Sequence, residues 1–220
     1  PLYGVVGMAD LLHEQFRAMP ESELQSCIED LRKSASGAHA LLENLLSWAL
    51  FERGLLRYSA QPIKLIPLID RCISIYEQNA NQKQLTIQRV GAEDVVVEGC
   101  RPMLESILRN FVCNAVKYSH EGGFIVVHVE ATEKAVTVSV CDEGVGMSEE
   151  AVAQLFSLSE HETTRGTAGE KGTGIGLQLC RQLAEAHGSK ICVESKPGNG
   201  STFSFSLKRI PYESLTYANS

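Results

Sequence analysis

Several features that mark other classes of protein are missing from this 220-residue sequence. Its longest apolar stretches are only a few residues, far short of the ~20 needed to cross a bilayer, and no signal-peptide pattern is present. Lys and Arg number 20 against 27 Asp and Glu, which gives a net charge of −7, and no basic cluster interrupts this acidity. Binding to nucleic acid or directly to a membrane is therefore not expected.

Closely spaced cysteines are also missing. The seven cysteines are an odd number, and the two nearest, Cys180 and Cys192, are too far apart for C-x-x-C zinc or redox spacing. Free thiols in a reducing compartment are predicted, which favours a cytoplasmic location. The first residue is Pro1 rather than Met, so we expect a piece of a longer protein.

The first part of the chain has a helical repeat. From Leu24 to Ala49, apolar residues recur with steps alternating four and three, an a/d heptad pattern typical of helices packed at a shallow angle. A shorter run from Leu2 to Phe16 has the same spacing, and the breaker at 18–22, which contains Pro20, separates the two. An antiparallel helical hairpin is predicted.

Two arrangements of this hairpin are compatible with the pattern. It can pack on its own domain, or it can form half of a four-helix bundle completed by a second copy of the chain. A helix of about thirty residues is ~45 Å long, too long to be buried against one short partner. We therefore favour a homodimer through the hairpin.

After Gly54, short strand-like runs alternate with helical patterns. The runs are 63–66, 85–90, 95–97, 124–130, 135–141, 190–194 and 201–207, and the helical patterns are 67–79, 103–118, 149–156 and 175–187. They predict a mixed sheet covered by helices on one face, and hence an α+β fold: a helical hairpin followed by an α/β sandwich. The expected domains are 1–57 and 58–210, with a hinge at 58–62 and a linker at 211–220.

Three glycine clusters fall in the second part: Asp142-Glu-Gly144-Val-Gly146, Gly172-Thr173-Gly174-Ile175-Gly176-Leu177 and Gly198-Asn-Gly200-Ser-Thr202. Glycine lets backbone N–H groups approach a ligand closely. The middle cluster opens a helical pattern, whose free N–H groups suit a phosphate. Its spacing matches neither the dinucleotide fingerprint nor the P-loop.

A fourth element is the predicted helix that carries Asn110, Asn114 and Lys117 along nearly one stripe. Asparagine is a poor residue for a helix interior, so two on one face call for a reason. Either both asparagines are solvated surface groups, or their carbonyl oxygens coordinate Mg²⁺ while the lysine binds a phosphate.

Together and in this order, the four elements resemble the N, G1, G2 and G3 boxes of the sensor histidine kinases. That family belongs to the GHKL superfamily, which also holds the HSP90, gyrase and MutL ATPases and has the Bergerat-type sandwich. Phe156 falls at the family's F box, although the usual second Phe is missing. The hairpin resembles the family's dimerisation and phosphotransfer domain, so the resemblance covers nearly the whole chain.

The resemblance implies an ATP and Mg²⁺ site. Asn114 is expected to coordinate Mg²⁺ with support from Asn110, and Lys117 is expected to meet a phosphate. The glycine clusters complete the expected nucleotide contacts with Gly144, Gly146, Gly172, Thr173, Gly174, Ile175, Gly176 and Leu177.

At the base end, the resemblance implies that Tyr118 lies beside adenine and that Asp142 accepts a hydrogen bond from its amino group. Thr202 is expected to hold the same base edge through water. The polar, glycine-rich stretch 157–171 is expected to be a mobile lid. Its Arg165 and Lys171 are either phosphate contacts or solvated charges.

The implied function is the catalytic core of a two-component sensor kinase, within the intracellular portion of a larger membrane-anchored sensor, with a response-regulator receiver domain as partner. The alternatives are a GHKL nucleotide-binding regulator and an ATPase. Hydrolytic relatives place a glutamate one turn before the metal-binding asparagine, where this chain has Asn110, which cannot take a proton. The related serine kinases lack the long heptad hairpin.

The phosphoacceptor histidine is expected outside the chain. The family's motif, His-[Asp/Glu]-x-[Arg/Lys]-x-Pro, ends at Pro1-Leu2, which puts the histidine five residues upstream of Pro1. His13-Glu14 has a similar pattern, but Pro20 comes two places too late and His13 lies next to the predicted turn. We therefore expect no phosphoacceptor within residues 1–220.

Overall fold

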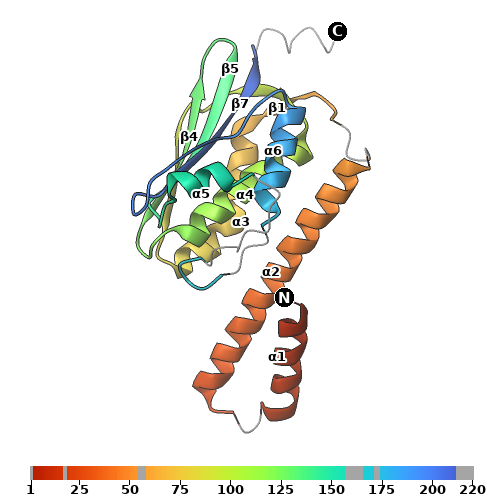
Figure 1. Ribbon diagram of the computed structural model, residues 1–220, viewed down its shortest axis with the longest axis vertical. Helices are drawn as coiled ribbons and strands as arrows, with labels where there is room; N and C mark the ends of the chain where they lie inside the picture. Colours follow the sequence, from red (N-terminus) through yellow and green to blue (C-terminus); the bar gives the residue numbers. More distant parts are fainter. Residues whose placement is uncertain (1, 17–18, 54–57, 157–165, 171–173, 212–220) are drawn as a thin grey trace. The chain divides into compact units, whose positions relative to one another are not determined.

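The computed structural model describes residues 2–16, 19–53, 58–156, 166–170 and 174–211. The chain divides into two compact units, Pro1–Leu56 and Arg57–Ser220 (Figure 1). Within the described residues, no helix combines the length and the apolar character that crossing a membrane requires.

The first unit is a helical hairpin of α1 (Leu2–Gln15) and α2 (Glu21–Glu52). Acidic Glu21 and Glu23 lie in the first turn of α2, where they complement the positive end of the helix dipole. Several large apolar side chains of the heptad region remain exposed in the single chain: Ile28 by 50%, Leu42 by 56% and Leu45 by 39%. The hairpin therefore has apolar surface that its own two helices do not cover.

The second unit is built on a seven-stranded sheet in the order β1-β3-β7-β5-β4-β2, with β6 paired to β7. Only β2 and β4 pair in parallel among these described strands. The strands are β1 (Gln61–Lys64), β2 (Thr86–Gly91), β3 (Val96–Gly99), β4 (Phe124–Ala131), β5 (Ala135–Asp142), β6 (Cys192–Ser195) and β7 (Ser201–Ile210).

Helices α3 (Leu65–Gln82), α4 (Arg101–Tyr118) and α6 (Gly176–Ala186) cover one face of this sheet, and α5 (Glu149–Gln154) is a short further helix (Figure 1). Burial alternates along β5 and β7, as expected for a sheet with one covered face. Phe111 of α4 packs on Phe203 and Phe205 of β7, with ring centroids 5.5 and 5.9 Å apart. The α+β prediction, with a hairpin followed by a sandwich, is confirmed.

One expected strand, 63–66, was wrong in its second half. Strand β1 ends at Lys64, and α3 begins at Leu65. Pro67 lies in the first turn of α3, where a missing N–H costs no helical hydrogen bond. Leu65, Leu68 and Ile69 are almost fully buried, and their helical spacing outweighs the β propensity of the run.

Candidate nucleotide site

Helix α4 carries the asparagine face. Asn110 donates from Nδ2 to the carbonyl of Ser106 in its own helix at 3.0 Å, and its Oδ1 takes no part in that bond. Asn114 is half-buried, and among the described residues its amide has no hydrogen-bond partner. A half-buried amide without a protein partner is unusual, and its carbonyl oxygen is suited to a ligand.

Lys117 and Tyr118 form a pair at the end of α4. The Lys117 ammonium donates to the Tyr118 hydroxyl at 2.7 Å and lies 4.4 Å from the centre of its ring. Lys117 is only 8% exposed. The structure therefore holds a positive charge one helical turn beyond Asn114 on the same face.

Asp142, the last residue of β5, is buried with 8% of its surface exposed. Its Oδ1 accepts from the backbone N–H groups of Gly144 at 2.9 Å and Ser201 at 3.2 Å. Burial raises the pKa of Asp142 from 3.8 to about 6, although both hydrogen bonds act to lower it. Both donors meet Oδ1, so Oδ2 has no partner among the described residues.

The strand register places Ser201, rather than Thr202, beside Asp142. The two residues pair directly across β5 and β7, and both are buried on the face that the helices cover. Neighbouring strand residues point to opposite faces, so Thr202 lies on the other face together with its partner Cys141. The expected contact between Thr202 and the base edge does not fit this geometry. The sequence indicates the face of Ser201, because Ser201 lies at even spacing from the apolar Phe203, Phe205 and Leu207 and so points to the same side of the strand.

Ser201 belongs to a hydrogen-bonded group that joins the first and third glycine clusters. Ser195 Oγ donates to the carbonyl of Gly200 at 2.9 Å and accepts from the Met147 N–H at 2.8 Å. The Ser201 hydroxyl lies 2.9 Å from Ser195 Oγ. Because the only proton of Ser195 goes to Gly200, Ser201 is the donor in this pair, and its own lone pairs remain available for water or a base.

Loop packing requires three of the glycines in these two clusters, namely Gly144, Gly146 and Gly200. A Cβ on Gly144 would overlap the carbonyl of Tyr118, and one on Gly146 would overlap that of Lys196. Gly200 has φ +76°, and its Cβ would overlap the carbonyl of Asp142. The two loops therefore interlock around Asp142.

Replacing Gly200 by Ala is expected to destabilise the fold by about 3 kcal/mol or more, because it adds a steric overlap to the cost of a positive φ. Gly198 is the matched control: it has the same φ of +76°, and nothing lies within 4 Å of its Cβ position. Gly198→Ala is expected to cost about 1–2 kcal/mol. Urea unfolding of both variants measures the difference, and equal losses would contradict the interlocking.

The middle glycine cluster is partly described. Gly174 has φ +72°, and α6 begins at Gly176 after Ile175, with no side chain capping its N-terminus. These uncapped N–H groups are suited to an anion. Gly172, Thr173, Lys171 and Arg165 lie outside the described residues, as does the stretch 157–165 of the expected lid.

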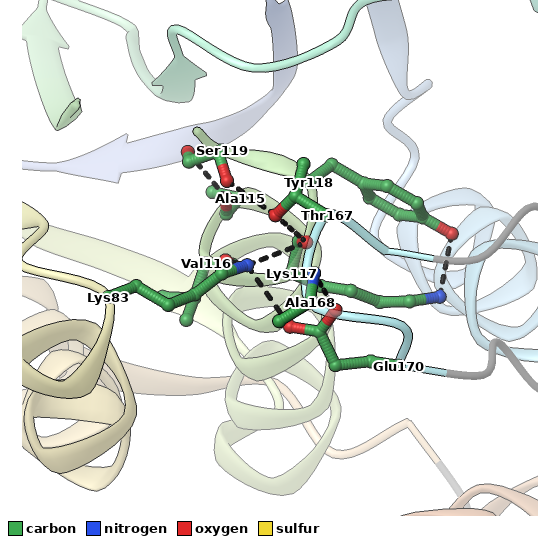
Figure 2. Close-up of polar contacts among 9 residues, drawn as sticks. All are labelled: Lys83, Ala115, Val116, Lys117, Tyr118, Ser119, Thr167, Ala168 and Glu170. Carbon is green, nitrogen blue, oxygen red and sulfur yellow. Dashed lines mark hydrogen bonds and ion pairs between the residues drawn. The ribbon is translucent and has the colours of Figure 1, made fainter. Parts of the chain in front are cut away.

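Residues 166–170 of that expected lid are described, and hydrogen bonds attach them to the end of α4 (Figure 2). The Thr167 N–H donates to the carbonyl of Lys117 at 3.1 Å, and its hydroxyl donates to that of Ser119 at 2.7 Å. Gly166 lies against Lys117, because an added Cβ would come within 2.6 Å of Lys117 Cγ. These five residues are thus hydrogen-bonded to α4, and the mobility of the stretch 157–171 stays a prediction.

The donor set limits which metal could bind. Among the described residues, no three His, Cys, Asp or Glu side chains come together as a metal-binding group. Mg²⁺ suits such a site, because it commonly keeps waters and substrate phosphates as ligands and needs only one or two from the protein. The Asn114 carbonyl is of the required type.

The comparisons with known proteins show the family to which the chain belongs. The model for the histidine kinase-, DNA gyrase B- and HSP90-like ATPases matches residues 99–211, which include α4, Asp142 and all three glycine clusters. The chain belongs to this family, and among its relatives are many sensor histidine kinases.

Two of these relatives are sensor proteins. The chain is 28% identical to the sensor protein KdpD of Clostridium acetobutylicum over 95% of its own length, and 31% identical to the sensor protein GacS of Pseudomonas syringae pv. syringae over 94%. It spans 23% of the length of each.

Solved structures give the same fold. Full-length ShkA in complex with AMPPNP matches with a TM-score of 0.66 and 25% identity, over 96% of this chain and 44% of that one. Histidine kinase ThkA in complex with the response regulator TrrA matches with a TM-score of 0.67 and 22% identity, over 94% of this chain and 58% of that one.

Proposed function

We propose that residues 58–210 bind Mg–ATP and that Asp142 recognises adenine. The observation that carries this proposal is the carboxylate itself: buried, fixed by two backbone donors through one oxygen, and without a described partner for the other. Such a group is costly for folding alone, since a buried charge is stable only when it is fully paired. The adenine amino group is the donor that completes it, and Ser201 supports the same edge through water.

At the other end of the site, Asn114 would hold Mg²⁺, with Asn110 beside it and Lys117 toward the phosphates. A bound Mg²⁺ supplies charge neutralisation of the triphosphate. The N-terminus of α6, entered through Gly174, would bind phosphate oxygens with backbone N–H groups. Tyr118 holds the Lys117 ammonium until a phosphate competes for it.

We further propose that the chain transfers the γ-phosphoryl group to a histidine upstream of Pro1, for relay to a response-regulator aspartate. Transfer is favoured over hydrolysis because Asn110 occupies the place of the hydrolytic glutamate, and an amide cannot activate water as a base. The alternative is a nucleotide-binding regulator without kinase activity, which would bind Mg–ATP through the same residues.

The partners follow from the first unit. The exposed apolar residues of the hairpin, such as Ile28 and Leu42, support burial against a second copy in a four-helix bundle. ThkA is a histidine kinase in complex with a response regulator, and we propose that residues 1–57 of this chain present the same kind of surface. The seven free cysteines support a cytoplasmic setting.

Incubated alone with Mg–ATP, the chain is expected to gain no acid-labile phosphate. It is expected to phosphorylate a longer version that carries the upstream histidine but has Asn114→Ala, because that chain supplies only the acceptor. Radiolabel from the γ-phosphate, followed by acid and base treatment, distinguishes phosphohistidine from other products.

Two outcomes would contradict this assignment. Acid-labile phosphate on the chain alone, absent from His13→Gln, would make His13 the acceptor. Binding of ATP with no label on either protein, and none on a longer chain that keeps Asn114, would support the regulator alternative.

A further inference from the structure

The carbonyl end of α4 is capped by three separate segments of the chain. An α-helix leaves its last four carbonyls without helical partners, and their partial negative charge sums to about half a unit. Here the backbone N–H groups of Ser119, Thr167 and Val145 donate to the carbonyls of Ala115, Lys117 and Tyr118 respectively. The Lys83 ammonium donates to the carbonyls of Val116 and Lys117. This capped end is where Lys117 and Tyr118 lie.

Lys83 is the charged member of this cap, and it comes from the C-terminus of α3. Its Nζ donates to the carbonyls of Val116 at 2.8 Å and Lys117 at 2.9 Å, and it lies 3.1 Å from Glu170 Oε1 (Figure 2). An ammonium group has three protons, so these three acceptors use all of them. The Lys83 side chain is only 13% exposed.

Glu170 connects this cap to the loop 166–170. Its second carboxylate oxygen accepts from the Ala168 N–H at 2.9 Å, and its carbonyl accepts from the Gly166 N–H at 2.8 Å. The Thr167 contacts with α4 complete the attachment (Figure 2). The loop is thus closed on itself and fixed to the helix through Lys83.

We propose that Lys83 and Glu170 are positioning residues for the phosphate end of the nucleotide site. Resting on the proposed ATP binding, the inference adds two residues that belong to none of the glycine or asparagine clusters. Lys83 fixes the backbone of Lys117, and Glu170 attaches the loop 166–170 to Lys83, so the end of α4 that carries Lys117 and this loop keep a constant distance from each other. Lys83 also offsets the negative helix end, which otherwise opposes a triphosphate.

A purely structural role predicts a different result from a positioning role. Loss of a stabilising contact lowers the melting temperature and affects all ligands of the site alike. A positioning role on the phosphate side weakens ATP binding and leaves adenosine, which lacks phosphates, unaffected. The comparison of these two ligands is therefore the readout.

The test uses Lys83→Met, Glu170→Gln and the double variant in the whole chain. The matched control is Glu185→Gln, which removes the carboxylate of an exposed ion pair with Arg181 at the same 3.1 Å. Titration with a non-hydrolysable ATP analogue is expected to show about tenfold weaker binding for Lys83→Met, because a displaced Lys117 would lose about one charge-assisted hydrogen bond to the phosphates. Adenosine affinity and the control are expected to stay unchanged, and Lys83→Arg, which keeps the charge and donors, to recover part of the loss.

Amide hydrogen exchange provides a readout that needs no nucleotide. In both single variants the Thr167 and Ala168 amides are expected to exchange faster than in the wild-type chain, and the double variant to behave like Lys83→Met, since both act through one contact. Unchanged exchange, or equal losses for ATP and adenosine, would overturn the inference. If the wild-type chain binds no ATP while exchange responds as expected, the proposed function fails and the loop attachment stands.

Discussion

The Asp142→Asn variant is expected to bind ATP at least ~100-fold more weakly than the wild-type chain while being more stable at neutral pH. The asparagine Oδ1 can still accept from Gly144 and Ser201, so the local fold is kept. Its NH₂ group replaces Oδ2 and points a donor at the adenine amino group. Sites built to bond a polar group reject the mismatched partner strongly, because both groups are then left unpaired.

The gain in stability follows from the raised pKa of Asp142. In the folded state this pKa is about 6 instead of 3.8, so the folded protein binds this proton more tightly than the unfolded chain. The resulting stabilisation is fully present below pH ~4 and is lost as the pH rises through ~6. At pH 7 the buried charge therefore costs about 1–3 kcal/mol, which asparagine removes.

Calorimetric titration and thermal unfolding at pH 5 and 7.5 test both halves. The stability gain of Asp142→Asn is expected to be larger at pH 7.5 than at pH 5. Asp70→Asn is the control, because Asp70 is 53% exposed and pairs with Arg89 on the surface. GTP bound as tightly as ATP, or full ATP affinity in Asp142→Asn, would exclude Asp142 as the adenine contact.

Asn114→Ala is expected to reduce phosphoryl transfer to a longer acceptor chain by about a thousandfold or more. The amide has no described partner in the protein, so alanine costs no internal hydrogen bond and, as a better helix former, does not lower stability. The loss would therefore come from the metal and phosphate end of the site, where charge neutralisation carries most of the catalysis.

The measurement is the initial rate of labelling with Mg–ATP, together with adenosine affinity and the melting temperature. Adenosine binding is expected to be unchanged, because Asp142 and Ser201 are untouched. Asn79→Ala, at an exposed position of α3, is the control for an Asn-to-Ala change in a helix. Transfer at the wild-type rate in Asn114→Ala would show that this residue does not serve the metal.

Most of the elements could be predicted because their signals are local. Alternating apolar residues marked β4, β5 and β7, and a heptad pattern marked α2, since each period reports which side of an element is buried. The second half of the strand expected at 63–66 was wrong, because so short a run, with three apolar residues in four, cannot distinguish a strand from the first turn of a buried helix. Burial of Leu65, Leu68 and Ile69 decided for the helix.

The α+β class and the family resemblance could be predicted from the sequence alone, as could the candidate residues Asn110, Asn114, Lys117 and Asp142. The phase of Ser201 with Phe203 and Phe205 predicts which face it lies on, but its pairing with Asp142 depends on the register between β5 and β7, which only the folded sheet sets. The contact between Lys83 and Glu170, which are 87 positions apart, is likewise formed only in the tertiary structure. No periodicity reports a contact over that separation, since it exists only once α3, α4 and the loop have packed together.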